Sequence, residues 1–193
     1  MKNLSAELSS LTGFPKLPHW VLRLYLRFPS LVPVRVRWKI ATKGLGLMLS
    51  EIIKNNESGS NKDIVKACKE LGFKQGQKVK NEFKVSNDNF EETLRVVVFA
   101  NRLFGINAKI AQKNGSSATT RTTKCSWAGS DYWSAKPCGA LSAWELGLVE
   151  GLNPDVKVKF LKRMSKGDDC CEASYELCHP EEATGRREDL RTQ

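Results

Sequence analysis

The order of hydrophobic patterns in this 193-residue chain predicts an α+β fold. Helical periodicity dominates as far as Gly105, and short alternating runs appear only after it. These runs form two pairs, each around a turn, with one helical pattern between the pairs. Strands joined by tight turns pair antiparallel. We therefore expect N-terminal helices followed by hairpin, helix and hairpin, with the strands forming one antiparallel sheet.

The first third of the chain contains several prolines and one clear helical stretch. Four prolines before residue 34 prevent one continuous helix, because proline lacks an N–H and clashes with the preceding turn. Residues 34–55 then repeat apolar side chains at three- and four-residue steps, which predicts a helix with one apolar face. That face carries Trp38, Ala41, Leu45, Leu49 and Ile52.

A second helix is expected to begin at Asn61, which is a suitable N-cap after a polar linker. Apolar side chains continue at helical spacing as far as Phe83. Gly72 and Gly76 disfavour that continuation, since each glycine costs up to about 1 kcal/mol in a helix interior. The apolar face at the start of this helix carries Ile64, Val65, Cys68 and Leu71.

The clearest helical pattern starts at Asn87 or Asp88 and closes at Gly105, a residue type that commonly ends helices. Its regular spacing predicts one continuous stripe of mostly apolar side chains. The stripe carries Phe90, Leu94, Val97, Val98, Asn101 and Phe104.

The remainder of the chain supplies the strands. Residues 106–111 and 118–125 flank Asn114-Gly115, which is a strong hairpin signal. A helix over 138–151 follows, with proline in its first turn, where a missing N–H costs no intrahelical bond. The second hairpin is expected over residues 156–177, with a turn at 165–169.

The charge is unevenly distributed along the chain. The net charge is +10, and residues 1–84 hold all of the excess, with 16 basic and 6 acidic side chains. We expect a basic helical N-terminal extension over residues 1–60 and an α+β small-molecule-binding domain over residues 61–178. Residues 179–193 show no periodicity and are expected to form a disordered tail.

The basic stretch at residues 16–43 contains no acidic side chain. Such a run favours an anionic surface or an acidic protein as a partner. Two other interpretations stay open. The stretch could be a solvated helix face, or it could bind nucleic acid with Trp20, Tyr25 and Trp38 stacking on bases. The sequence leaves the oligomeric state unknown.

No charge-free stretch exceeds eight residues, whereas a membrane span needs about 20 mostly apolar residues. The first residues also lack a basic region followed by an apolar core, so no secretory signal is expected. We therefore expect a cytoplasmic protein with no transmembrane segment. Six cysteines in that compartment are expected to be thiols, metal ligands or catalytic groups rather than a disulfide framework.

Three of the cysteines are predicted to meet at one site. Cys125 lies at a strand end and Cys138 at a helix N-terminus. Cys171 is placed on the inward strand face by alternation with Ala173 and Tyr175. Cys138 is the best electrostatic candidate for a thiolate, because the N–H groups at a helix N-terminus favour negative charge. Each of the three could equally be a small buried apolar side chain.

Asp168 and three tryptophans complete the candidate site. Gly167-Asp168 is first of all a tight turn, although Asp168 is also a candidate general base or orienting group beside a thiol. Trp127, Trp133 and Trp144 are candidate substrate-binding residues of an apolar pocket, or ordinary core residues.

A zinc site stays open and is not favoured. Cys125, Cys138 and Cys171 together with Asp168 or Glu172 would form a dispersed site. Neither a C-x-x-C nor an H-x-x-x-H pair is present, and structural zinc sites usually use such close spacings. The cofactor is therefore unknown from the sequence.

Four short motifs follow one another along the chain in a recognisable order. They are Thr123-Lys124-Cys125-Ser126-Trp127, Pro137-Cys138, Gly151-Leu152-Asn153-Pro154 and Gly167-Asp168-Asp169-Cys170-Cys171. In this order the chain resembles the L-2-amino-thiazoline-4-carboxylic acid hydrolase family and, more distantly, the 4-vinyl reductase domain. The likeness covers residues 88–178.

The first resemblance implies hydrolysis of a cyclic amidine C–N bond, which opens a thiazoline ring toward a carbamoyl-cysteine product. It would place Cys125, Cys138, Asp168 and Cys171 in the site. The second implies a non-catalytic small-molecule sensor or carrier, often with a zinc site near its pocket. That pattern has a cysteine on the strand before the Gly-Asp turn, where this chain reads FLKR at 160–163, so a metal of that type is in doubt.

Two hypotheses of function therefore stand side by side. The main one is a cysteine-dependent hydrolase of a small cyclic C–N substrate. The alternative is a non-catalytic small-molecule-binding or sensory domain. Whether the chain is an enzyme stays open at this level.

Overall fold

The computed structural model describes residues 20, 27, 33–56, 61–87 and 89–178, and confirms the α+β class. Helices come first, followed by a hairpin, a helix and a second hairpin, in the predicted order. The predicted tail at 179–193 and most of residues 1–32 lie outside the described residues. The helices are α3 (Val34–Asn55), α4 (Asn61–Phe83), α5 (Phe90–Leu103) and α6 (Ala135–Leu152), and the strands are β1 (Ala108–Asn114), β2 (Ser117–Thr122), β3 (Val156–Lys162) and β4 (Cys171–Leu177).

The four strands form one antiparallel sheet with the order β1-β2-β4-β3. Each hairpin pairs its own two strands, and β2 pairs with β4 across the middle of the sheet. Gly115 in the first turn has φ +50°, and Gly167 in the second has φ +98°. Both values lie in the left-handed region that glycine adopts without strain, which explains why glycine occupies both turns.

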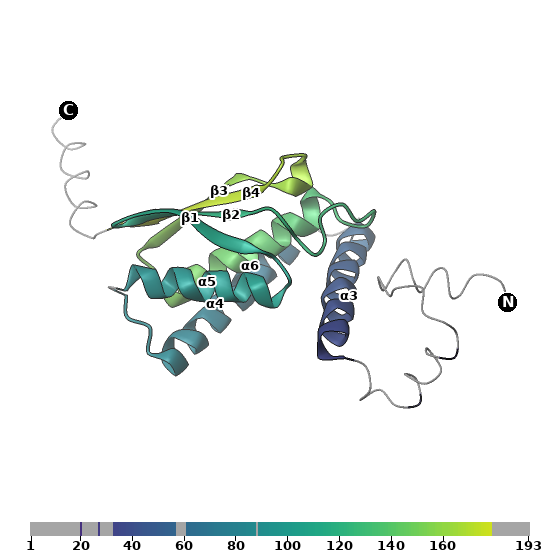
Figure 1. Ribbon diagram of the computed structural model, residues 1–193, viewed down its shortest axis with the longest axis horizontal. Coiled ribbons are helices and arrows are strands. Elements are labelled where there is room, and N and C mark those ends of the chain that lie inside the picture. Colours follow the sequence, from purple (N-terminus) through teal and green to yellow (C-terminus); the bar gives the residue numbers. More distant parts are fainter. Residues whose placement is uncertain (1–19, 21–26, 28–32, 57–60, 88, 179–193) are drawn as a thin grey trace.

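The helices cover one face of this sheet (Figure 1). Helices α5 and α6 lie against the strands, and α4 packs against α6. The main core lies between α5, α6 and the inner face of the sheet, and includes Phe90, Leu94 and Val97 of the predicted α5 stripe. Its fully buried members are Phe90, Leu94, Val97, Ala118, Val149, Val156, Ala173 and Tyr175.

Helix α4 is continuous through Gly72 and Gly76, and these are its only buried residues. They meet a matching pair of glycines on α6, Gly147 and Gly151, so that the two helix backbones almost touch. A Cβ added to Gly72 would lie 2.0 Å from the carbonyl oxygen of Trp144. The glycines that appeared unfavourable for a helix are therefore the residues that allow α4 to pack.

Helix α3 contacts the rest of the molecule through small and polar side chains. Its buried residues are Thr42, Gly46, Ser50 and Ile53. The indole of Trp127 fills the space beside Gly46 and donates a hydrogen bond from Nε1 to the carbonyl oxygen of Thr42 at 2.8 Å. The apolar face identified in the sequence is a different one, and it is exposed. The large indole of Trp127 fits only against a helix face without bulky side chains. This explains why α3 buries its face of small residues and not its apolar face.

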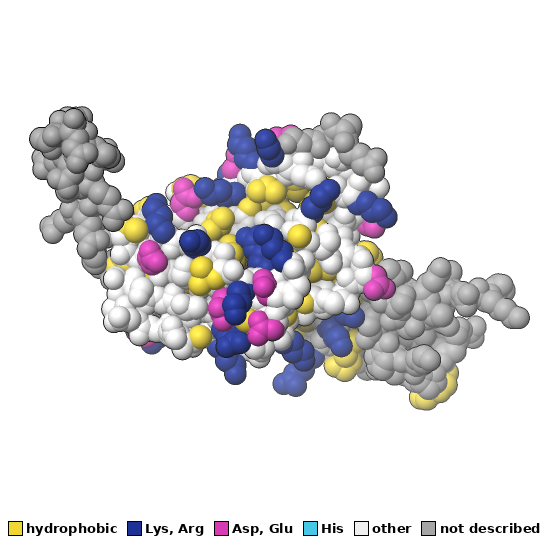
Figure 2. Space-filling model, turned by 90° about the horizontal axis from the view of Figure 1, so that it is seen from above, with side chains coloured by type: hydrophobic (Ala, Val, Ile, Leu, Met, Phe, Trp, Pro, Cys, Tyr) yellow, Lys and Arg dark blue, Asp and Glu magenta, His cyan; other side chains and the backbone are white. Residues whose placement is uncertain are grey.

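The outer face of the sheet carries basic and acidic side chains, which stand beside one another in Figure 2. Arg121 on β2 pairs with Glu172 on β4 at 3.6 Å, and Lys157 lies opposite Glu176 in the strand register. None of the helices within the described part of the chain meets the length and apolarity that crossing a bilayer requires.

Candidate functional site

A cavity of about 70 Å³ lies between the inner face of the sheet and the first half of α6. Strand residues such as Thr120, Thr122 and Ala173 form one wall, and residues of α6 form the other. Both apolar and polar side chains line the cavity. Those that carry chemistry are Asn101, Cys125, Trp133, Cys138, Ser142, Glu145, Arg163, Cys171 and Glu172.

The structure brings the three predicted cysteines to this one cavity. Cys125 follows the end of β2, Cys138 lies in the first turn of α6, and Cys171 opens β4. All three are free thiols and each is half-buried, so each is covered by protein yet partly open to solvent. Three thiols from three separate parts of the chain therefore line one cavity.

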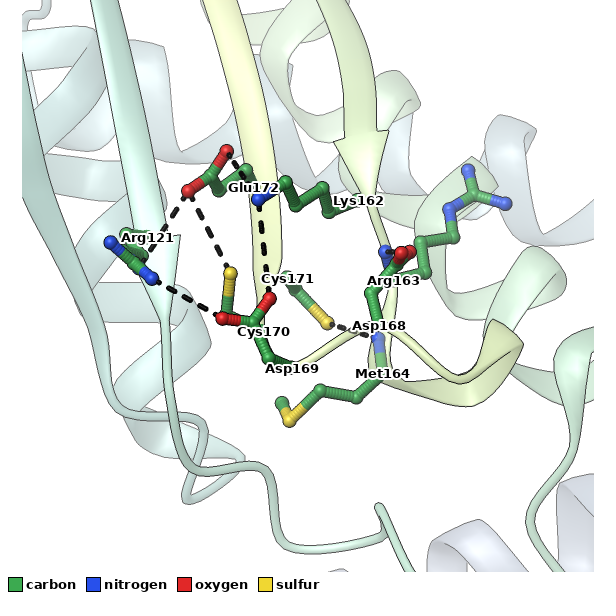
Figure 3. Close-up of polar contacts among 9 residues, drawn as sticks. All are labelled: Arg121, Lys162, Arg163, Met164, Asp168, Asp169, Cys170, Cys171 and Glu172. Atoms are coloured by element: carbon green, nitrogen blue, oxygen red, sulfur yellow. Dashed lines mark hydrogen bonds and ion pairs between the residues drawn. The ribbon is translucent and has the colours of Figure 1, made fainter.

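Cys170 and Cys171 point to opposite sides of β4, as Figure 3 shows. The Cys171 sulfur accepts a hydrogen bond from the backbone N–H of Met164 at 3.3 Å. The Cys170 sulfur lies on the other side, 3.7 Å from a carboxylate oxygen of Glu172 and near the ion pairs of Arg121 and Asp169. The predicted inward orientation of Cys171 follows from this strand alternation.

Burial makes two of the cavity thiols poor anions. Loss of hydration raises the pKa of Cys171 to about 11, and the hydrogen bond from Met164 offsets only part of that effect. Burial also raises the pKa of Cys125, with smaller opposing contributions from the N–H groups of Trp127 and Ala128. A thiol with a pKa near 11 is ionised in only about one molecule in 10⁴ at pH 7.

A polar network that the sequence reasoning missed lies beside the thiols. The Tyr175 hydroxyl donates to Glu145 Oε1 at 2.5 Å, and Asn101 Nδ2 donates to Glu145 Oε2 at 3.2 Å. Burial raises the pKa of Glu145, although these two hydrogen bonds and the positive charge of Arg163 act in the opposite direction. Burial, followed by the charge of Glu145, also raises the pKa of Tyr175 well above its ordinary value.

The sequence did contain a signal for this network. Glu145 is the only charged residue in the stretch from 137 to 149. It lies four residues after Leu141, and therefore on the same side of the helix as that apolar residue. Asn101 interrupts the apolar stripe of α5 in the same way. A polar residue on an otherwise apolar helix face needs a partner inside the fold. Here the two side chains are partners of each other.

Replacing Glu145 with glutamine is expected to change how stability depends on pH. Because the pKa of Glu145 is raised on folding, the folded chain binds this proton more tightly than the unfolded chain. The wild type should therefore lose stability relative to Glu145→Gln as pH rises from about 4.3 through the raised pKa. Urea denaturation across this range measures the difference.

Glu91 provides a contrast of opposite sign. Lys113 and Arg95 lower the pKa of this exposed carboxyl. Relative to Glu91→Gln, the wild type should lose stability as pH falls, not as it rises. A constant difference between wild type and Glu145→Gln at all pH values would show that Glu145 has an ordinary pKa.

Asp168 lies in the turn between β3 and β4, outside the lining of the cavity. It is exposed, and its Oδ2 accepts a hydrogen bond from the backbone N–H of Arg163 at 2.7 Å. Its observed role is therefore the turn-capping one. Arg163 itself lines the cavity, and its guanidinium lies 4.7 Å from the centre of the Phe160 ring. Its Nε is covered and has no hydrogen-bond partner among the described residues.

Only one of the three candidate tryptophans lines the cavity. Trp133 does so, and it stacks on Trp127 with ring centres 4.8 Å apart. Trp127 is directed toward α3 instead. Trp144 faces a separate apolar groove of about 700 Å³ between α4 and α5, where its Nε1 donates to Gln75 at 2.6 Å. No cysteine is among the residues that line this α4–α5 groove.

The described residues contain no group of three or more His, Cys, Asp or Glu side chains placed to hold a metal ion. The three thiols therefore line the cavity without converging on a common position that a metal ion could occupy. Both histidines, His19 and His179, lie outside the described residues.

Comparison with known proteins gives likeness in fold. Subunit 3 of the trafficking protein particle complex from Naegleria fowleri, solved covalently bound to palmitic acid, aligns with a TM-score of 0.52 at 16% identity. The alignment covers 75% of this chain and 97% of that one. The two chains share a fold.

A second solved structure is the phenol-responsive sensory domain of the transcription activator PoxR with phenol. It aligns with a TM-score of 0.48 at 12% identity, over 70% of this chain and 74% of that one. No protein-family model matches the chain, and no curated protein does either. The predicted relation to the hydrolase family therefore has no support at the family level, while the small α+β fold is shown.

Proposed function

We propose that this chain is a small-molecule-binding domain and that its ligand occupies the cavity between the sheet and α6. The observation that carries the proposal is the convergence on one cavity of three half-buried thiols and of Glu145, which is hydrogen-bonded to Tyr175. Ordinary cores avoid partly open cavities lined by polar groups, since such groups are costly to cover without partners. Binding sites combine apolar walls with a few convergent polar groups in this way.

The volume of the cavity limits the ligand. About 70 Å³ is less than the roughly 150 Å³ of an apolar cavity that binds benzene, and far less than the roughly 300–1,000 Å³ of pockets for drug-sized ligands. The part of the ligand inside the cavity therefore contains only a few heavy atoms. The partly open thiols provide space for the remainder toward solvent.

The polar groups indicate the chemistry of that part of the ligand. Arg163 offers a covered Nε–H without a partner, which favours a hydrogen-bond acceptor. Burial raises the pKa of Glu145, and the positive charge of Arg163 acts in the opposite direction beside it. Phe160 and Trp133 supply apolar surface beside them. A short chain, or the edge of a small ring, that carries one acceptor group fits this combination.

The proposal predicts that a small probe stabilises the folded chain through this cavity. Phenol combines one ring with one hydrogen-bonding group, and L-2-amino-thiazoline-4-carboxylate is the substrate that the sequence resemblance implies. At a hundred times its Kd, either probe would stabilise the fold by about 2.7 kcal/mol, which thermal denaturation detects. Cys138→Phe should fill the cavity and abolish the response, whereas Cys138→Ser, of similar size, should preserve it.

Cys68→Ser controls for changes at a thiol far from the cavity, on α4. If neither probe stabilises the wild type, or if Cys138→Phe responds as strongly as Cys138→Ser, ligand binding at this cavity is excluded for these probes. Protection of Cys125, Cys138 and Cys171 from iodoacetamide by the probe gives an independent readout of occupancy.

The same cavity supports hydrolysis as a second candidate function, because thiols and a carboxyl share its wall. Burial raises the pKa of Cys125 and of Cys171, which disfavours the thiolate form that a nucleophile needs and so favours binding over catalysis. Cys138 is then the remaining nucleophile for ring opening. Release of carbamoyl-cysteine from the thiazoline probe would establish turnover, and turnover that survives serine at all three cysteines would exclude a thiol mechanism.

A covalently held fatty acid, as in the trafficking subunit, is not the ligand that we propose here. The cavity beside the thiols is too small for a long acyl chain. The larger α4–α5 groove is apolar, but no cysteine lines it.

The basic stretch at residues 16–43 is proposed to contact an anionic surface or an acidic protein. Within its described part, Arg35, Arg37 and Lys39 are exposed on α3. This proposal treats residues 1–60 as an extension of the ligand-binding part at 61–178.

A further inference from the structure

Helix α3 presents a regular apolar stripe that the other described residues leave largely uncovered. Trp38 is 51% exposed, Leu45 39%, Met48 55% and Ile52 49%. Val34 and Ala41 continue the stripe toward the start of the helix and are also exposed. The indole N–H of Trp38 binds the carbonyl oxygen of Leu103, but half of its ring surface still faces solvent.

The spacing within this stripe is specific. Starting at Val34, the steps are alternately four and three residues, which is the a/d pattern of a coiled coil. Trp38, Leu45 and Ile52 take position a, and Val34, Ala41 and Met48 take position d. A repeat of 3.5 residues keeps one seam facing a second helix along its whole length, whereas a flat surface or a sheet imposes no such period.

Apart from the contact of Trp38 with Leu103, the seam is open toward a partner, because the other described elements pack on a different face of α3. Its own contacts use Gly46, Ser50 and Ile53, at positions b and f, and Thr42 at position e. Position g carries Arg37, Gly44 and Glu51, all exposed. A second helix can therefore approach the seam from the g side.

The charges at position g select a second copy of this chain in antiparallel orientation. In the register that sets Leu45 against Ala41 of the second copy, Trp38 meets Met48 and Ile52 meets Val34, so every a residue faces a d residue. The flanking g positions then bring Arg37 against Glu51 of the second copy, twice by symmetry. Gly44 lies on the two-fold axis, and a Cβ added there would meet nothing within 4 Å in the single chain.

A parallel pairing lacks this complementarity. Parallel coiled coils pair position g with position e of the other helix, which would set Arg37 against uncharged Thr42.

We propose that this chain forms a symmetric dimer through an antiparallel α3–α3 pair with the stripe from Val34 to Ile52 as its seam. The proposal is independent of what occupies the cavity.

Sedimentation velocity on the full chain at low salt tests the dimer. The wild type should be dimeric, and Met48→Glu should weaken dimerisation by a hundredfold or more, on the order of the loss of two buried methionines. Phe83→Glu is the matched control, since Phe83 is 70% exposed on α4, outside the seam. It should leave the dimer intact. Thermal melts confirm that both variants fold.

Charge exchange at position g tests the register. Arg37→Glu places Glu against Glu51 of the second copy, and Glu51→Arg places Arg against Arg37, so each alone should weaken the dimer about tenfold. Mixing the two variants should restore association, because each Glu of one copy then meets an Arg of the other. The double variant Arg37→Glu/Glu51→Arg should also dimerise like the wild type.

Three results would overturn the proposal. A monomeric wild type at high protein concentration rules out a second copy as the occupant. Dissociation by Phe83→Glu but not by Met48→Glu places the interface elsewhere. Failure of the mixed variants to associate, with Met48→Glu still disruptive, rejects the antiparallel register.

Discussion

Replacing Gly147 with alanine is expected to destabilise the fold by about 3 kcal/mol or more. A Cβ at this position would lie 1.9 Å from the carbonyl oxygen of Lys69 on α4, which is backbone and cannot rotate away. The two helices would have to separate. Overpacking in a well-packed interior typically costs about 1–3 kcal/mol, and a backbone clash of this kind belongs at or above the upper end.

The sign of this effect is diagnostic. In an ordinary helix, alanine is more favourable than glycine by up to about 1 kcal/mol, so a glycine of no packing importance would be improved by the change. Gly139, also within α6, has nothing within 4 Å of an added Cβ. Gly139→Ala should therefore stabilise the chain by up to about 1 kcal/mol, in contrast to Gly147→Ala.

Thermal and urea denaturation of the two variants measures both effects. For a chain of this size, about 3 kcal/mol corresponds to a fall in Tm of about 6–12 °C. Gly72→Ala and Gly151→Ala should resemble Gly147→Ala, with added Cβ atoms 2.0 Å and 2.2 Å from backbone oxygens. Equal or higher stability of Gly147→Ala would disprove the close approach of α4 and α6.

Replacing Trp127 with alanine is expected to cost about 3–5 kcal/mol and to release α3 from the rest of the molecule. This range is typical for removing a buried Trp or Phe side chain, and Trp127 is only 1% exposed. The change removes the stack on Trp133, the contact with Phe104 and the hydrogen bond to Thr42. Because the hydrogen bond to Thr42 and the packing beside Gly46 join α3 to the loop before α6, α3 should lose more protection than the other helices.

Hydrogen exchange of backbone amides, read separately for α3 and α6, distinguishes local release from general destabilisation. Trp127→Phe should be milder, since it retains an aromatic ring and loses chiefly the Nε1–H bond to Thr42, worth about 1 kcal/mol. Undiminished protection of α3 in Trp127→Ala would show that other contacts hold this helix.

The secondary structure was largely predictable because its signals are local. The spacing of Phe90, Leu94 and Val97 placed the buried face of α5, and the observed N-cap is Asn89, close to the predicted start. Asn114-Gly115 and Gly167 located the two turns, since both require backbone conformations that glycine adopts readily. These features depend on residues within a few positions of one another.

The candidate site was predictable in part. Strand alternation and the position at a helix start were sufficient to place Cys125, Cys138 and Cys171 at one cavity. The same reasoning could not find Glu145, because its partner Tyr175 lies 30 residues away on another element. Nor could it decide between the two roles considered for Asp168, because an aspartate can both cap a turn and act as a general base. In the structure its carboxylate accepts a hydrogen bond within the turn.

By itself, the sequence determined the class of fold, the order of the elements and the candidate thiols, because periodicity and turn chemistry are properties of neighbouring residues. Only the tertiary structure decided which faces of α3, α4 and α6 are buried. Where α4 packs against α6, the buried contact is made by glycines, because two helix backbones can approach closely only where no Cβ lies between them. On α3 the tertiary structure buries the small face beside Trp127 and leaves the apolar seam exposed, because the surroundings of a helix, not its own pattern, determine which surface it can bury.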